Sequence, residues 1–134
     1  MWNPGRLTWQ VPLGGCTADA IAARLTDGRG LVYRYRTQRG MDGLPGEEGT
    51  FLLCTFWLAH AQALAGEVEA ARASFERAAA YANDVGLLAE EVDPAGAEMI
   101  GNYPQAFSPI GLVNAAWAIS QAEEGRPARP EAAP

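Results

Sequence analysis

The sequence predicts an all-α fold in which about four helices are arranged in two concentric layers. Residues 50–65 begin with turns that are apolar on every side, which is typical of a helix buried all round. Residues 67–83 instead carry one polar face, and residues 110–122 are again apolar around most of the circumference. Inner helices wrapped on both sides and outer helices with one wet face produce this alternation, whereas each helix of a four-helix bundle would show a polar face. About four helices are too few to close a ring.

The elements of the N-terminal half are separated by glycine and proline. Residues 1–16 have no period and are expected to be irregular, like a displaced, non-native start. The first helix is predicted to begin at Thr17, a candidate N-cap, and to end at Asp27-Gly28. Residues 31–36 alternate only partly and form at most a short extended segment. Residues 40–49 form a loop with four glycines, one proline and three acids.

The C-terminal half alternates long helices with one long acidic stretch. The helix of residues 50–65 ends at Gly66, and the helix of residues 67–83 ends at Asp84-Val85-Gly86. Residues 87–108 are irregular, and the last helix is predicted from Pro109 or Ile110 to Ala122. Residues 123–134 hold three prolines and scattered charge, which predicts a disordered tail.

Composition excludes several classes of protein. At 134 residues and 14.2 kDa the chain fits one domain, and 49% apolar with 19% charged residues is a globular composition. The longest apolar run, Phe51–Ala59, is about half of what a bilayer requires, and no signal segment opens the chain, so a cytoplasmic location is expected. The two cysteines, Cys16 and Cys54, lack metal-ligand spacing. We therefore expect no metal, no cofactor and no disulfide framework.

The charge balance argues against polyanionic partners. Sixteen acids face ten arginines and no lysine, for a net charge of −6. The one basic cluster, Arg34, Arg36 and Arg39, is explained by a solvated edge. Neither nucleic acid nor a membrane surface is therefore an expected partner.

Two pairs of acids precede the two apolar helices. Glu47 and Glu48 lie in the loop before residue 50, and Glu90 and Glu91 lie in the irregular stretch. Loops that enter inner helices at the same end of a ring converge on its axis, where carboxylates can bind sugar hydroxyls or act as general bases. Alternatively, Glu47 and Glu48 merely complement a helix dipole. That explanation is weaker for Glu90 and Glu91, because no helix starts directly after them.

Other notable residues have ordinary explanations. His60 lies within a helix without a nucleophile or ligand partner, and Cys54 is expected to be a small core side chain. Trp57 and Trp117 are expected in the core. Phe107, at a loop end, fits either the core or a platform for a sugar.

Four segments together resemble a known family. They are Leu31-Val-Tyr-Arg-Tyr35, Gly43-Leu-Pro-Gly-Glu-Glu-Gly-Thr-Phe-Leu-Leu-Cys-Thr-Phe-Trp-Leu-Ala59, Ala82-Asn-Asp-Val-Gly-Leu-Leu-Ala-Glu-Glu-Val-Asp-Pro94 and Gly101-Asn-Tyr-Pro-Gln-Ala-Phe-Ser108. In order and spacing they are similar to the C-terminal part of the bacterial family 15 glycoside hydrolases, the glucoamylase-like and trehalase-like enzymes, over roughly Ala20–Ala118. The resemblance implies an (α/α)6 barrel, here only partial, and inverting hydrolysis of α-glucosidic bonds.

The resemblance also implies roles for the acids. The family's general base lies in a glycine-leucine-leucine-x-glutamate stretch, which falls on Gly86 to Glu90. Glu90 is thus the predicted catalytic base. Glu47, Glu48, Glu91 and Phe107 are predicted to bind the substrate, an α-glucoside such as a maltooligosaccharide, an isomaltose-type sugar or trehalose.

Two departures from the family pattern predict an incomplete enzyme. The general acid belongs to a tryptophan-glutamate-x-arginine motif, but Trp2 and Trp9 are followed by Asn3 and Gln10. Pro109 stands where the family usually has histidine. We therefore expect a C-terminal fragment, with residues 17–122 as barrel segment between the irregular start and the tail, that is inactive alone. Its uncovered apolar surface should promote self-association.

An alternative is a non-enzymatic helical-repeat module of the tetratricopeptide type. Residues 57–66 followed by residues 70–78 mimic one helix pair of a 34-residue repeat. Such modules need at least three copies, and a shift of 34 residues in either direction recovers no second copy.

Overall fold

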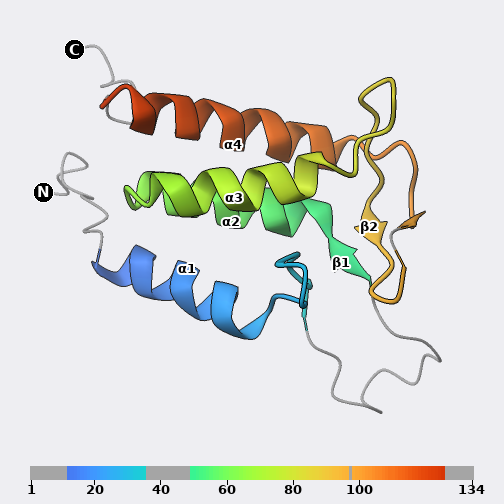
Figure 1. Ribbon diagram of the computed structural model, residues 1–134, viewed down its shortest axis with the longest axis horizontal. Coiled ribbons are helices and arrows are strands. Elements are labelled where there is room, and N and C mark those ends of the chain that lie inside the picture. Colours follow the sequence, from blue (N-terminus) through green and yellow to red (C-terminus); the bar gives the residue numbers. More distant parts are fainter. Residues whose placement is uncertain (1–11, 36–48, 97, 126–134) are drawn as a thin grey trace, which may run out of the picture.

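The computed structural model describes residues 12–35, 49–96 and 98–125. Within them lie four helices: α1 (Pro12–Arg24), α2 (Leu52–Leu64), α3 (Val68–Ala79) and α4 (Phe107–Glu123). Three strands of two residues each complete the fold: β1 (Thr50–Phe51), β2 (Glu91–Val92) and β3 (Met99–Ile100). The predicted all-α class with little regular strand is therefore confirmed (Figure 1).

The helices pack in the two layers that the sequence predicts. The helices α2 and α4 lie against each other, and α3 packs on both of them, while α1 packs on α2. Figure 1 shows that α2 and α4 begin at the same end of the molecule, beside the strands, whereas α1 and α3 run the opposite way. This arrangement is that of a partial all-α toroid, with α2 and α4 as the inner pair.

The core lies between the three long helices of the C-terminal half. Phe56 is fully buried at its centre and packs its ring against that of Phe75, with the centroids 5.7 Å apart. Gly111 allows α4 to approach α2 closely, because a Cβ atom there would lie 2.8 Å from Leu53 Cδ1 and 3.2 Å from Phe56 Cβ. Buried alanines at Ala71 and elsewhere extend the contact toward the far ends of the helices.

The three strands join the beginnings of the inner helices to the acidic stretch. They form an antiparallel sheet in the order β1-β2-β3, with Thr50 opposite Val92 and Glu91 opposite Ile100. The buried Thr50 hydroxyl also donates to the Val92 carbonyl at 3.2 Å. Strand β2 is thereby fixed next to the N-terminal end of α2, with β3 on its other side.

Several predicted helix boundaries are wrong by a few residues; α1, for example, ends at Arg24 and α3 at Ala79, each before its predicted end. The first helix begins at Pro12 rather than Thr17, because proline at the first helical position lacks only an N–H that has no partner there. The second begins at Leu52, since Thr50 and the next residue pair with β2 instead. The last begins at Phe107 and extends to Glu123. The predicted tail beyond residue 125 lies outside the described residues.

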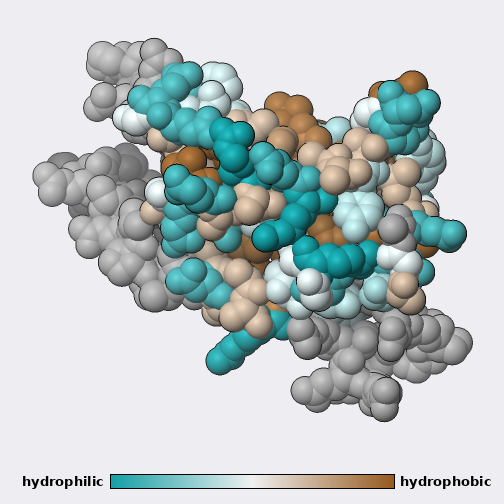
Figure 2. Space-filling model, in the orientation of Figure 1, coloured by the Kyte–Doolittle hydropathy of each residue, from teal (hydrophilic) through white to brown (hydrophobic). Residues whose placement is uncertain are grey.

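The prediction that α2 is buried all round is also wrong. Trp57 is 57% exposed and Leu64 is 52% exposed, because no described residue covers that side of the helix. On α4, Phe107 and Trp117 are exposed to a similar degree. The uncovered apolar surface expected from the sequence is therefore present. By contrast, Figure 2 shows mainly hydrophilic residues over the face formed by α3. None of the described helices meets the length and hydropathy of a bilayer-spanning segment.

Candidate active site

Glu90 ends an irregular segment whose backbone is held on both sides. The two preceding residues, Leu88 and Ala89, are fully buried and anchor the segment in the core. The Glu90 carbonyl accepts the N–H of Leu52 at 3.1 Å, and the Glu90 N–H donates to the Asn102 carbonyl at 3.0 Å. Glu90 is thus fixed between the start of α2 and the turn that leads to α4.

The carboxylate of Glu90 is held by the same turn. Its Oε2 atom accepts the backbone N–H of Asn102 at 3.1 Å, and the side chain is half-buried. Gly101 makes this close approach possible: its φ is +75°, and a Cβ atom there would lie 3.0 Å from Glu90 Oε2 and 3.1 Å from Glu90 Cβ. The carboxylate is thus oriented by a backbone donor and remains partly open to solvent.

The turn before Glu90 is stabilised by Asn83. Its side-chain oxygen accepts the N–H groups of Val85 at 3.1 Å and Leu87 at 2.8 Å. Its amide nitrogen donates to the Tyr103 hydroxyl at 2.6 Å. Asn83 therefore connects the end of α3 to the segment that contacts Glu90.

Two further hydrogen bonds fasten the segment of Glu90 to the start of α4. The Gln105 N–H donates to the Leu88 carbonyl at 2.9 Å, and the buried Ser108 hydroxyl donates to the Ala89 carbonyl at 2.8 Å. The position of Glu90 consequently depends on residues that follow it by 12 to 18 positions. These residues belong to the Gly101–Ser108 segment, which is one of the four segments of the family resemblance. The resemblance did not indicate that this segment contacts Glu90 and the residues before it.

The side chains of Glu90 and Glu91 contact different residues. Glu91 is half-buried in β2 and lies over Gly49, where a Cβ atom would be 2.6 Å from Glu91 Oε2. Phe107 is 62% exposed at the first position of α4, which leaves its ring at the surface. Glu47 and Glu48 lie outside the described residues.

Two surface grooves lie away from Glu90. One, of about 450 Å³, is lined by Asp27, Arg77 and neighbouring residues of α1, α2 and α3. The other, of about 590 Å³, lies between α1 and α2 and is mostly apolar. Burial raises the pKa of the Cys54 thiol in this second groove, and the positive charge of Arg34 partly opposes that shift. Among the described residues, no cluster of histidine, cysteine and acids is suited to a metal ion.

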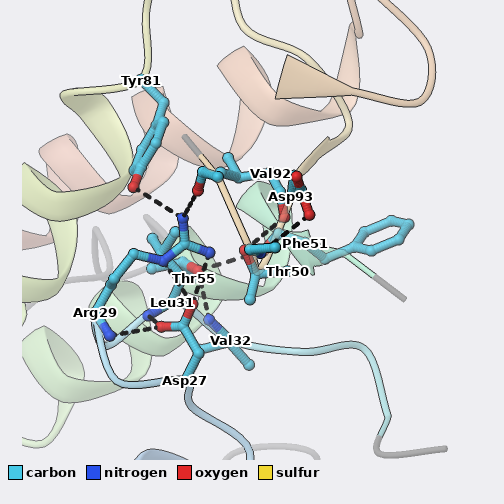
Figure 3. A network of polar contacts seen from close by, with 12 residues as sticks. Asp27, Arg29, Leu31, Val32, Thr50, Phe51, Thr55, Tyr81, Val92 and Asp93 are labelled. Atoms are coloured by element: carbon cyan, nitrogen blue, oxygen red, sulfur yellow. Dashed lines mark hydrogen bonds and ion pairs between the residues drawn. The ribbon is translucent and has the colours of Figure 1, made fainter. Parts of the chain in front are cut away.

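A polar network around Arg29 was not predicted from the sequence. The Asp27 carboxylate accepts the N–H groups of Arg29 at 2.9 Å and Leu31 at 3.0 Å, and it pairs with the Arg29 guanidinium at 2.7 Å. The guanidinium also donates to the Gly96 carbonyl at 2.6 Å and to the Tyr81 hydroxyl at 3.4 Å (Figure 3). Burial lowers the pKa of Arg29, but the hydrogen bond and negative charge of Asp27, with Tyr81, raise it by more, so the net shift of the pKa is upward.

The network lies beside the hydrogen bonds that connect the segment of residues 31–32 to β1 and α2. Figure 3 shows it next to Thr50 and Thr55, and the Thr55 hydroxyl accepts the Val32 N–H at 2.9 Å. The Phe51 N–H in turn donates to the Val32 carbonyl at 2.8 Å. The Asp-Gly-Arg-Gly sequence of residues 27–30 indicates a turn. It does not indicate that Arg29 contacts Tyr81 and Gly96, which are 52 and 67 residues away.

Comparison with known proteins agrees with this architecture. Residues 16–117 match the family model described as glycosyl hydrolases family 15. Over 108 residues, the chain is 45% identical to a trehalase of Mycolicibacterium smegmatis and 46% identical to a trehalase of Mycobacterium tuberculosis, which is 81% of this chain and 16% of each relative. A trehalase of Thermoplasma acidophilum is 40% identical over 90 residues, which is 67% of this chain and 16% of that relative.

The chain thus spans about one sixth of the length of the curated relatives it matches. No solved structure matches it significantly. The family model covers α2, α3, Glu90 and most of α4, in a continuous match that exceeds half of the chain. The chain therefore belongs to glycosyl hydrolases family 15.

Proposed function

We propose that this chain carries the general-base segment of an inverting α-glucoside hydrolase, with Glu90 as the base and trehalose as the preferred substrate. The observation that supports the base assignment is the double anchoring of Glu90, through both backbone groups and through its carboxylate, to the two segments that open α2 and α4. The preference for trehalose rests on the names of the relatives, all of which are trehalases.

In the proposed reaction Glu90 takes a proton from a water molecule. The oxygen of this water forms a bond to the anomeric carbon as the bond from that carbon to the glycosidic oxygen breaks, and a general acid protonates the departing oxygen. Water attacks from the face opposite to the leaving group, so the anomeric configuration is inverted. The base contributes about 10²–10⁴-fold to the rate.

The chain is proposed to lack turnover by itself. No tryptophan-glutamate-x-arginine motif supplies the acid in this sequence. A general acid also requires a pocket dry enough to raise its pKa. Of the candidates in the described residues, Glu90 and Glu91 are only half-buried. Purified chain should therefore release no glucose from trehalose or maltooligosaccharides above the level of an E90Q variant, and clear turnover above that level would contradict the proposal.

Glu90 can be tested in a full-length relative. The 108 matched residues of the M. smegmatis trehalase are replaced by the corresponding residues of this chain. We expect this chimera to hydrolyse trehalose, and E90Q to lower kcat by at least about 10²-fold without changing the melting temperature. Glu98, an exposed acid nearby, provides the matched control E98Q, which should retain full activity. Normal turnover in E90Q would show that Glu90 is not the base.

The helical-repeat alternative has no comparable support. The helix pair it depends on, α2 and α3, lies within the region matched by the glycosyl hydrolase model. The cytoplasmic location remains a prediction of the sequence.

A further inference from the structure

A polar groove lies between α1, α2 and α3, beside the turn of residues 27–30. It has a volume of about 450 Å³, which is in the range of small-molecule binding sites. Its apolar lining consists of Leu58, which is almost fully buried, and three alanines. Neither Glu90 nor the residues bonded to it line the groove, so the groove is separate from the candidate active site.

The groove contains a buried amide with one unused donor. Gln62 of α2 is only 6% exposed, and its Oε1 atom accepts the hydroxyl of Ser74 at 2.8 Å, which fixes the orientation of the amide. The opposite atom of the amide, Nε2, donates to no described residue. Because a buried donor without an acceptor is unfavourable, Nε2 favours a ligand oxygen in the groove.

The groove also contains an arginine without a counter-ion. Arg77 follows Ser74 by three positions on α3, so the two side chains lie on the same face of the helix. The Arg77 guanidinium lies against the backbone of Gly30, where a Cβ atom would be 3.1 Å from Nη1. No described residue forms a hydrogen bond or an ion pair with Arg77. Its positive charge is therefore available to a ligand.

The other charges of the groove cancel. Asp27 and Arg29 both line it, but they pair with each other at 2.7 Å, and the Asp27 side chain is only 8% exposed (Figure 3). Arg77 thus leaves one net positive charge in the groove, in a chain whose net charge is −6. A guanidinium binds a carboxylate through two parallel hydrogen bonds, and a single negative charge neutralises it.

We propose that this groove binds a small molecule that has one carboxylate and a short aliphatic body. Arg77 pairs with the carboxylate, the Gln62 Nε2 atom donates to one of its oxygens, and the aliphatic part lies on Leu58 and the alanines. An anion with two charges fits less well, because the Asp27 carboxylate repels the second charge. Binding in this groove does not require that Glu90 is the catalytic base.

Equilibrium dialysis of the full chain against radiolabelled butyrate tests the proposal. We expect a Kd of about 1 mM, which matches the free energy that a ligand of this size gains per atom. Butyramide has the same shape without the charge, and sulfate has charge without an aliphatic body. Both should bind at least about threefold more weakly than butyrate. Absence of butyrate binding up to about 10 mM, or equal binding of butyramide, overturns the proposal.

The same carboxylate chemistry occurs at the C-terminus of a peptide. Acetyl-alanyl-alanine presents the carboxylate in that form and is dialysed in parallel. Butyrate binding that is at least as tight supports a free small acid as the ligand. Tighter binding of the peptide overturns that assignment and points to a peptide C-terminus instead.

Arginine variants locate the bound carboxylate. R77M removes the guanidinium and keeps the apolar stem, so it should raise the Kd for butyrate by about three- to tenfold. Arg72 provides the matched control, because it lies on the same helix, pairs with Glu76 and does not line the groove. R72M should leave the Kd unchanged. An unchanged Kd in R77M, or an equal rise in R77M and R72M, overturns the proposal.

A variant of the buried amide tests the second contact. Q62E keeps an acceptor for the Ser74 hydroxyl but replaces the donor with a carboxylate, and it should weaken butyrate binding at least as much as R77M. Circular dichroism shows whether each variant keeps its helices. Because Arg77 is exposed, R77M is expected to fold even if Q62E does not, and its Kd then decides the test. Folded Q62E that binds butyrate as tightly as the native chain refutes the role of Gln62.

Discussion

Replacement of Gly101 by alanine tests whether Glu90 is held where the structure places it. Gly101 has a φ of +75°, a conformation that costs an L-residue about 1–2 kcal/mol. The new methyl group would also lie 3.1 Å from Glu90 Cβ and 3.0 Å from its Oε2. The carboxylate can rotate away, but Cβ cannot, because both backbone groups of Glu90 are hydrogen-bonded.

The magnitude follows from these two effects. To avoid the new methyl group, the Glu90 carboxylate must move and weaken its hydrogen bond from the Asn102 N–H. This hydrogen bond contributes about 1 kcal/mol at a half-exposed position. We therefore expect G101A to lower the free energy of unfolding by about 2–3 kcal/mol in total. Gly66 provides the matched control: its φ is +83°, and no atom lies within 4 Å of a Cβ built there. G66A should show only the backbone contribution of about 1–2 kcal/mol.

Urea denaturation measures both variants. With a slope of about 1–3 kcal/mol per molar urea, the extra 1 kcal/mol of G101A moves the midpoint by roughly a further 0.3–1 M. A double-mutant cycle adds specificity, because in an E90G background, which lacks both the Cβ atom and the carboxylate, the excess cost of G101A over G66A should disappear. Equal destabilisation by G101A and G66A in the native background would refute the proposed packing of Glu90 on Gly101.

Three further predictions concern the rest of the chain. S108A removes the buried hydroxyl that donates to the Ala89 carbonyl, and it should cost about 1–3 kcal/mol in the same urea assay; a neutral result would mean that the carbonyl finds another donor. Burial raises the pKa of Cys54, so in a C16S background iodoacetamide should alkylate it more slowly than free cysteine at about pH 8.5. The stability that depends on its neutral thiol is fully present below the ordinary pKa of a thiol and is lost as pH rises through the raised value; stability independent of pH there would contradict the shift. Without a partner the chain should self-associate with increasing concentration in sedimentation velocity, and W117E should reduce this; a monomer at all concentrations would show that the exposed face is not adhesive.

Local sequence patterns predicted the helices better than they predicted the site. The alternation of apolar and amphipathic segments gave α2, α3 and α4 to within a few residues, because helical periodicity is a local property. Glu90 and Glu91 were noted as an acid pair from the sequence, but the role of base was given to Glu90 only through a family resemblance and stays a prediction. The residues that hold it, Asn102 and Gly101, lie 12 and 11 positions away and belong to no periodic element, so nothing in their local pattern indicates the contact.

The Arg29 network was not predicted for the same reason: its contacts join residues that are far apart in the sequence. Asp27-Gly28 was interpreted as the end of the first helix, but that helix ends at Arg24, and the Asp27 carboxylate instead orders the next turn and binds Arg29. The guanidinium then contacts Tyr81, just after α3, and Gly96, between β2 and β3, which are too far away in sequence for a local pattern to predict. Contacts of this kind depend on the finished packing of the helices.

The error in predicting burial is itself informative about function. For α3 the apolar positions of the sequence and the buried positions of the structure agree, since Ala71 and Ala78 are fully buried and Phe75 packs on the core. For α2 and α4 the sequence contains more large apolar residues than the described fold buries, and Trp57 and Trp117 are the largest of the excess. Exposed tryptophan contributes nothing to the stability of an isolated helix, whereas its burial against a partner contributes about 1.5–3 kcal/mol or more. The excess therefore lies on α2 and α4, whose first turns are hydrogen-bonded to the segment of Glu90, and not on α3. The exposed apolar side chains are what a partial toroid leaves uncovered, and they lie on the same two helices whose first turns hold the segment of Glu90.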